Sequence, residues 1–273
     1  MTLRSNDAFE TVPADLADPA SGLALTGWRA DDGDRDRFTV EARYDSGGLL
    51  LLPAHAARQA ALLIAHEAYA IPRGHHCVFR SLSCGTAPVS EAAVRASAPA
   101  PGARLAIDVE CIDRDVRRGH LVGSLFRASV RSADGELGTG EVDFAFLSPA
   151  VYRFVGGSAA TTAQAQPWPQ SPTTEIRPDA DLLLFRGRPV DHIPGMVLAE
   201  AALHLAENHI GPGRIRRFTG TFTGHAGPGE PCTVQLRSGA SAGSFDVQAL
   251  QAGRRVYEGS VDVDPARPEM SPK

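Results

Sequence analysis

The chain has 273 residues, of which 43% are hydrophobic and 22% charged, a composition typical of a folded globular protein rather than a disordered one. Its 27 basic and 32 acidic side chains give a formal net charge of −5, which disfavours non-specific nucleic-acid binding. No apolar run approaches the ~20 residues that span a bilayer, so we expect neither a nucleic-acid nor a membrane partner.

The lysine and cysteine content excludes several classes of catalytic site and indicates the cellular compartment. The only lysine is Lys273, which excludes Schiff-base, pyridoxal-phosphate and Walker-A lysines within the folded part of the chain. The four cysteines show no Cys-x-x-Cys spacing, and residues 1–12 lack the apolar segment of a signal peptide. We therefore expect a cytoplasmic protein with reduced thiols.

The first half of the chain combines one long helix with many strands. Residues 1–22 are polar and form an expected lead-in, and residues 49–69 are apolar and alanine-rich, which predicts a buried helix. Alternating or β-branched stretches bounded by Gly, Pro or Asp predict strands. These strands are expected at 23–28, 37–44, 77–83, 91–97, 105–112, 123–132 and 140–147.

The second half repeats this order after a change in composition. Residues 148–180 are rich in Ser, Thr, Ala, Gln and Pro, and we expect a linker over 151–180 between units at 23–150 and 181–273. Beyond it, residues 194–208 predict a second apolar helix. Strands are expected at 182–185, 214–223, 232–238, 244–251 and 254–263.

A long apolar helix followed by several antiparallel strands, found twice, is typical of an internal duplication. Such an order implies a sheet curved around a helix, which is the hotdog architecture of the α+β class. The sequence therefore predicts a tandem double hotdog: two long central helices wrapped by a curved, mostly antiparallel sheet.

One motif carries a family resemblance. The residues that open the second helix read Asp191-His192-Ile193-Pro194-Gly195-Met196, and Glu200-Ala201-Ala202 follow. This text resembles the second-half motif of the AfsA-type (A-factor biosynthesis) hotdog family. Supporting similarity lies in LALTGWR, in residues 57–76 and in SPAVYR.

The resemblance implies an enzyme that acts on acyl thioesters held by an acyl carrier protein. Family members transfer a β-ketoacyl group to the hydroxyl of dihydroxyacetone phosphate, to make γ-butyrolactone-type signals. The resemblance also implies that the protein uses no metal and no organic cofactor, and we add a homodimer as an expectation.

The chain departs from the family pattern on both helices, where Glu-x-x-Arg-Gln is usual. The first helix reads His55-Ala56-Ala57-Arg58-Gln59, so His replaces Glu. The second reads Glu200-Ala201-Ala202-Leu203-His204, so Leu replaces Arg and His replaces Gln. One Glu and one Arg therefore survive, on different helices.

Three catalytic candidates follow. Glu200 lies within an apolar helix, where a carboxylate is costly unless paired or facing a cavity, so we expect a buried general base with a raised pKa. His55 exchanges protons near neutral pH, and Arg58 offers a planar fork for a phosphate or oxyanion. Pseudo-twofold packing of the helices predicts that His55 and Glu200 face each other. The alternative is that His55 and Arg58 face solvent and that Glu200 faces solvent or a partner arginine.

Three further residues are candidates for substrate binding. His192 and Gly195 lie at the start of a helix, where backbone N–H groups can polarise a thioester carbonyl. The alternative is that Asp191 caps the helix and His192 packs against the sheet. His204 is four residues from Glu200 and within reach of it. His75-His76-Cys77 have no further ligands at useful spacing, so we expect no metal site.

Three functions stay open at this point. The first is acyl transfer of the γ-butyrolactone-synthase type. The second is a hotdog dehydratase, hydratase or thioesterase that uses a His55/Glu200 pair. The third is a non-catalytic acyl-binding relative. For the first two, an acidic carrier protein is expected to dock on arginines, either Arg214, Arg216 and Arg217 or, as an alternative, Arg117 and Arg118.

Overall fold

The computed structural model of the chain describes residues 9–13, 16, 22–46, 48, 50–86, 99–157, 164–177, 184–185, 188–189, 191–211 and 214–264. The chain forms two compact units, Met1–Thr161 and Thr162–Lys273.

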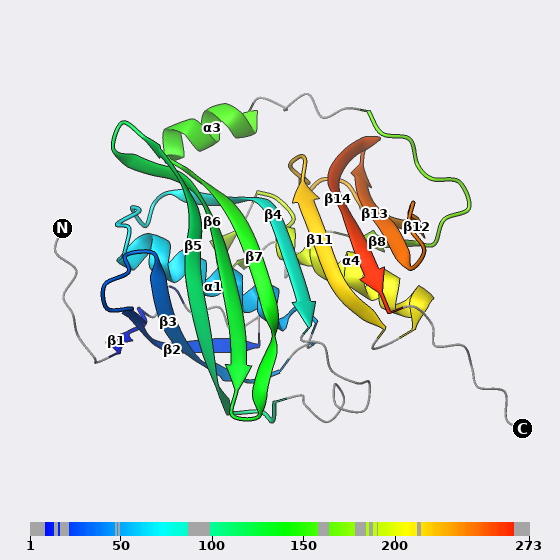
Figure 1. Cartoon of the computed structure of the whole chain (residues 1–273). Coiled ribbons are helices and arrows are strands. Elements are labelled where there is room, and N and C mark those ends of the chain that lie inside the picture. Colours follow the sequence, from blue (N-terminus) through cyan, green and yellow to red (C-terminus); the bar gives the residue numbers. More distant parts are fainter. Residues whose placement is uncertain are drawn as a thin grey trace, which may run out of the picture. The chain divides into compact units, whose positions relative to one another are not determined.

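The first unit is an antiparallel sheet with one long helix against a face of it (Figure 1). Its strand order is β1-β2-β3-β5-β6-β7-β4, and every pairing between neighbours is antiparallel. Its elements are β1 (Glu10–Thr11), β2 (Leu23–Ala30), β3 (Arg37–Tyr44), α1 (Leu52–Glu67), β4 (His76–Thr86), β5 (Ala103–Arg117), β6 (His120–Ser132), β7 (Gly135–Leu147) and α3 (Pro149–Gly157).

The sheet buries one face against α1. Along β3 the side chains alternate, with Phe38, Val40 and Ala42 buried and the residues between them more exposed, as the two-residue period of a strand requires. Helix α1 is buried on nearly all sides, through twelve of its sixteen residues. Its start approaches β7 closely: a Cβ on Gly140 would lie 2.3 Å from the carbonyl oxygen of Pro53, so glycine permits this packing.

The second unit repeats the arrangement with fewer strands. Its sheet has the order β11-β14-β13-β12-β8, again antiparallel throughout, and α4 lies against it (Figure 1). A separate short pair joins β9 to β10. The elements are β8 (Thr173–Ile176), β9 (Leu184–Phe185), β10 (Arg188–Pro189), α4 (Gly195–Ile210), β11 (Ile215–Phe222), β12 (Cys232–Ser238), β13 (Ser244–Gln251) and β14 (Arg254–Val263).

Helix α4 is buried along one side, whereas α1 is buried on nearly all sides. Its buried side chains are Met196, Leu198, Ala199, Ala202, Leu203, Leu205 and Ala206. Glu200, His204 and Asn208 are exposed, and their spacing of four residues places them on one face of the helix.

The predicted α+β class, with a long helix and antiparallel strands in each half, is confirmed. The segment expected as a linker holds more structure than its composition indicated. Tyr152 of α3 stacks on His76 of the first unit, with ring centroids 3.7 Å apart, and β8 pairs with β12 of the second unit. Polar, Thr-rich residues suit an exposed edge strand such as β8, which is why composition alone suggested a linker.

Two other expectations concern the N-terminal half. The lead-in contributes β1, since Glu10 pairs with Trp28 of β2. The strand expected at 91–97 lies outside the described residues. Among the helices that the structure does describe, none combines the length and hydrophobicity needed to cross a membrane.

Candidate active site

Helix α1 places polar side chains in the interior of the structure. Arg58 is 5% exposed and Gln59 2% exposed, while His55, one turn earlier, is half-buried. The Gln59 amide donates a hydrogen bond to the backbone carbonyl of Leu23 on β2, at 3.3 Å between Nε2 and O. An arginine cannot discard its charge when buried, so a buried guanidinium is costly unless it serves structure or chemistry.

Helix α4 presents its polar side chains outward. Glu200 and His204 are both exposed on the same face of the helix. The expectation that Glu200 is a buried carboxylate is therefore wrong. The reason is the register of the helix: the apolar residues on either side of Glu200 face the sheet, and the i, i+4 row that contains it faces away.

The start of α4 differs from the cap predicted for it. Pro194 occupies the N-cap position without a side-chain hydrogen bond, so Asp191 does not cap the helix. Gly195 packs against the ring of Phe222, and a Cβ there would lie 2.9 Å from ring atom Cε1. Gly195 therefore has a structural reason to be glycine, alongside its predicted contact with substrate.

Asp191 instead interacts with two histidines. His192 Nδ1 lies 2.7 Å from Asp191 Oδ1, and His225 Nε2 lies 3.8 Å from the same oxygen. Burial and the neighbouring His192 lower the pKa of His225 below its usual range. Sequence reasoning missed His225 because it lies 33 residues beyond His192, in the connection between β11 and β12.

A second polar cluster, also missed from the sequence, follows the end of α1. The Tyr69 hydroxyl donates to Asp36 at 2.9 Å, and Arg114 forms an ion pair with the same carboxylate at 3.1 Å. Burial is the main cause that raises the pKa of both Tyr69 and Cys111, whose thiol lies 2.9 Å from the Ser124 hydroxyl. Both groups therefore stay protonated near neutral pH, which favours a structural role over a nucleophilic one.

The sheet of the first unit carries a polar depression of about 370 Å³, lined in part by Arg29, Thr39, Asp108 and Arg131. Thr39 lies on β3 between the buried Phe38 and Val40, so the depression is on the face turned away from α1. Arg131 pairs with Asp108 in it, and none of the predicted site residues lines it. We therefore do not assign the substrate to this depression.

The predicted site residues fall into two groups. His55 and Arg58 lie one turn apart on α1 of the first unit. His192, Gly195, Glu200 and His204 lie on or just before α4 of the second unit. The first unit contributes an imidazole and a permanent cation, and the second a carboxylate, which are the groups that proton transfer and oxyanion stabilisation require. The pairing of His55 with Glu200 joins the two units and stays a prediction.

Comparison with known proteins identifies relatives along most of the chain. The chain is 31% identical over 235 residues to a 2-oxo-3-(phosphooxy)propyl 3-oxoalkanoate synthase of Streptomyces coelicolor, covering 76% of this chain and 73% of the relative. It is 27% identical over 284 residues to the synthase of the same name from Streptomyces virginiae, covering 90% and 93%. No protein-family model matches the chain.

Solved structures share the fold at low sequence identity. The 12:0-ACP thioesterase of Umbellularia californica matches with a TM-score of 0.57 at 11% identity, covering 84% of this chain and 94% of that one. An acyl-ACP thioesterase of Bacteroides thetaiotaomicron matches with 0.56 at 12%, covering 84% and 98%. A MaoC-like dehydratase matches with 0.52 at 12%, covering 79% and 83%. These hotdog enzymes bear out the predicted tandem hotdog fold, and the sequence relatives bear out the resemblance. The chain belongs to the AfsA-type family of 2-oxo-3-(phosphooxy)propyl 3-oxoalkanoate synthases, a family of hotdog-fold enzymes.

Proposed function

We propose that this chain transfers a β-ketoacyl group from an acyl carrier protein to a hydroxyl of a small phosphorylated acceptor such as dihydroxyacetone phosphate. The observation that carries the proposal is the 31% identity to a synthase whose name describes the ester of these two parts. The hotdog thioesterases and dehydratase share the fold only, so they do not favour hydrolysis or dehydration over transfer.

The proposed reaction is an ester synthesis without a change in oxidation state. The acceptor oxygen attacks the thioester carbonyl carbon and a C–O bond forms. The tetrahedral intermediate then collapses as the C–S bond breaks, which releases the carrier thiol. A base takes the hydroxyl proton during attack, and that proton returns to the departing sulfur. The protein must supply the base and stabilise the oxyanion.

We assign these roles to the three catalytic candidates. Glu200 acts as the base, and its exposure on α4 supports access by a substrate. Arg58 binds the phosphate or the developing oxyanion, and His55 exchanges the proton with Glu200. His192, Gly195 and His204 are proposed to border the substrate, because they lie at the start and on the exposed face of α4.

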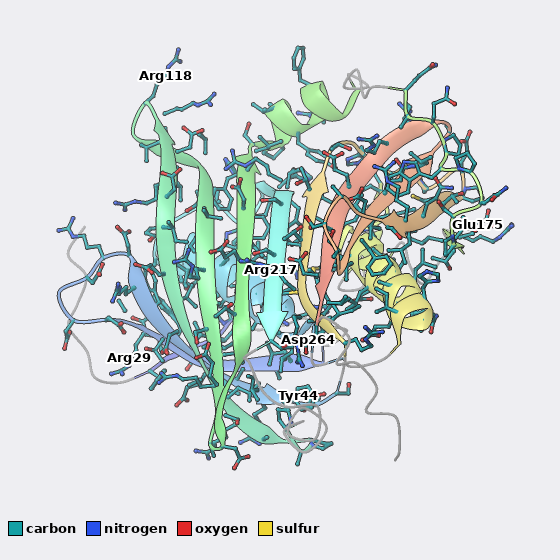
Figure 2. The ribbon with its side chains drawn as sticks, turned by 45° about the vertical axis from the view of Figure 1, so that its right-hand side comes forward. Arg29, Tyr44, Arg118, Glu175, Arg217 and Asp264 are labelled. Carbon is teal, nitrogen blue, oxygen red and sulfur yellow. The ribbon has the colours of Figure 1, made fainter. Side chains whose placement is uncertain are left out.

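The carrier protein is proposed to dock at the β5–β6 turn of the first unit. Arg118 stands at the tip of this turn and points away from the sheet (Figure 2), and Val116 beside it is 55% exposed. The antiparallel register of β6 with β7 places the start of α3 at the same end of the sheet, where Phe154 is 79% exposed. Cationic and apolar side chains together suit an acidic, partly apolar carrier.

Two of the three arginines that the sequence first suggested for docking, Arg214 and Arg216, are engaged within the second unit, so we favour the alternative at Arg118. Arg216 pairs with Asp264, and this pairing lowers the pKa of that carboxyl group. The Arg214 guanidinium donates to the carbonyl of Ile210 at the end of α4. We therefore expect Arg118→Glu to slow turnover of carrier-bound substrate while sparing a small thioester mimic. The comparison variant is Arg217→Glu, at the first-suggested position: it should leave both rates unchanged if the carrier docks at the turn, and slow only the carrier-bound substrate if the carrier docks there. Equal loss for both substrates in Arg118→Glu would argue against docking at the turn.

Product analysis tests the proposed function. Purified protein is incubated with β-ketoacyl carrier protein and dihydroxyacetone phosphate, and the small products are identified by mass spectrometry. The phosphorylated β-ketoacyl ester is the expected product. Free β-keto acid would identify a thioesterase, and loss of water from a β-hydroxyacyl carrier would identify a dehydratase. No change in any substrate would support a non-catalytic relative. The cytoplasmic location and the homodimer stay predictions.

A further inference from the structure

Two segments of the second unit that are distant in sequence meet just before α4. Asp191 and His192 lie at the end of the connection that leads into the helix, and His225 lies in the connection between β11 and β12. The backbone N–H of Ile193 donates to the carbonyl of Ala226 at 2.8 Å. Because this hydrogen bond joins the residues next to His192 and His225, it fixes the two histidines beside each other.

The three side chains form a compact set of donor atoms. One oxygen or nitrogen from each of Asp191, His192 and His225 lies within 4.8 Å of the other two. The rings of His192 and His225 have centroids 4.4 Å apart and are inclined by 47°. Ligand atoms on a tetrahedral zinc ion, with bonds of about 2.0–2.2 Å, lie roughly 3.3 Å from one another. The separations of 2.7 and 3.8 Å from Asp191 Oδ1 to the two imidazole nitrogens lie on either side of this value.

We propose that Asp191, His192 and His225 bind one divalent transition-metal ion, with Zn²⁺ as the best match. Two imidazole nitrogens and one carboxylate oxygen are a donor set that suits zinc, whereas Mg²⁺ and Ca²⁺ prefer oxygen ligands alone. The ligand side chains are exposed or half-buried, so an ion and a completing water molecule reach them from solvent. All three ligands belong to the second unit. His192 is also proposed to border the substrate, so ion binding has to be measured by readouts other than activity.

A bound ion would join the segment that starts α4 to the β11–β12 connection. Such a link is absent from an unfolded chain, because the ligands come from positions 33 residues apart. Binding therefore stabilises the folded second unit by mass action, and the melting temperature of the protein should rise with zinc concentration. This readout is separate from enzymatic activity.

The test is a titration of the full-length, chelator-treated protein with Zn²⁺ by calorimetry and with Co²⁺ by visible absorption. We expect one ion per chain and d–d absorption bands typical of a low-coordinate Co²⁺ site. His225→Ala and His192→Ala should each weaken binding at least about tenfold and abolish the zinc-dependent rise in melting temperature.

Two further variants control the experiment. His209→Ala removes an exposed histidine of α4 that lies outside the cluster, and it should bind zinc like the unaltered protein. Asp191→Asn keeps both imidazoles and should weaken binding without changing the stability of the zinc-free protein. The proposal is overturned if the unaltered protein binds no ion, if His225→Ala binds as tightly, or if His209→Ala loses as much affinity as His225→Ala.

Discussion

Helices α1 and α4 hold equivalent places in the two halves of a duplicated chain, yet their surroundings differ. Each has sixteen residues, of which twelve are buried in α1 and seven in α4. At equivalent positions, Arg58 and Gln59 of α1 are buried, whereas α4 has buried Leu203 and exposed His204. His55 is half-buried and its counterpart Glu200 is exposed.

The two helices therefore offer different side chains at corresponding positions. The buried polar side chains belong to α1, and the accessible carboxylate belongs to α4. A buried guanidinium costs free energy that a leucine does not, and the second half has a leucine at the same position. This contrast fits the proposed roles, in which Arg58 binds the phosphate or oxyanion and Glu200 is the base.

The largest effect is expected from making α1 resemble α4. Arg58→Leu should lower kcat/KM by about 100- to 1,000-fold, the range for loss of an oxyanion donor. Arg58→Lys should restore only part of the activity, since a point charge lacks the planar fork. Steady-state kinetics of both variants measure the effect, and thermal denaturation shows that they are folded. Full activity in Arg58→Leu would show that Arg58 has no catalytic role.

The next effect concerns the accessible carboxylate of α4. Glu200→Gln should lower the rate by at least ~100-fold, the lower end for general acid–base catalysis. Because the side chain is exposed, the free energy of unfolding should change by less than about 0.5 kcal/mol. The matched control is Glu207→Gln, which changes another glutamate about two turns further along the same helix. This variant should keep its activity. Equal rates for Glu200→Gln and the unaltered enzyme would remove Glu200 from the mechanism.

A double mutant tests whether His55 of α1 and Glu200 of α4 act together in catalysis. His55→Ala alone should also lower the rate by about 100-fold if the imidazole exchanges a proton with Glu200. When two groups act as a unit, removing both costs no more than removing one. The His55→Ala, Glu200→Gln enzyme should therefore be as slow as either single variant. If the fold-loss of the double variant equals the product of the fold-losses of the two single variants, the two residues act independently.

The smallest effect is on stability. Gln59→Leu removes the hydrogen bond that the Gln59 amide donates to the Leu23 carbonyl, so the free energy of unfolding should fall by about 0.5–1.5 kcal/mol. His204→Leu, at the equivalent position of α4, should change it by less than about 0.5 kcal/mol because that side chain is exposed. Urea denaturation of both variants measures the difference, and equal losses would contradict the different burial of the two helices.

The hydrophobic pattern was sufficient to predict the fold, because a helix such as α1 and strands such as β3 bury residues at their characteristic periods. It predicted the exposure of Glu200 wrongly, because an apolar composition does not reveal which face of a helix points away from the sheet. The contact between Asp191 and His225 could not be predicted from the sequence, because it depends on a backbone hydrogen bond between two loops. The polar composition of residues 151–180 did not reveal β8 (Thr173–Ile176), because an edge strand tolerates polar side chains.

The most direct test of acyl transfer follows release of the carrier thiol with a thiol-reactive chromophore. β-Ketoacyl carrier protein is mixed with enzyme at increasing concentrations of dihydroxyacetone phosphate. We predict negligible release without acceptor and a release rate that rises to saturation with acceptor, with one phosphorylated ester formed per thiol. Release at the same rate in the absence of acceptor would contradict the account and identify hydrolysis instead.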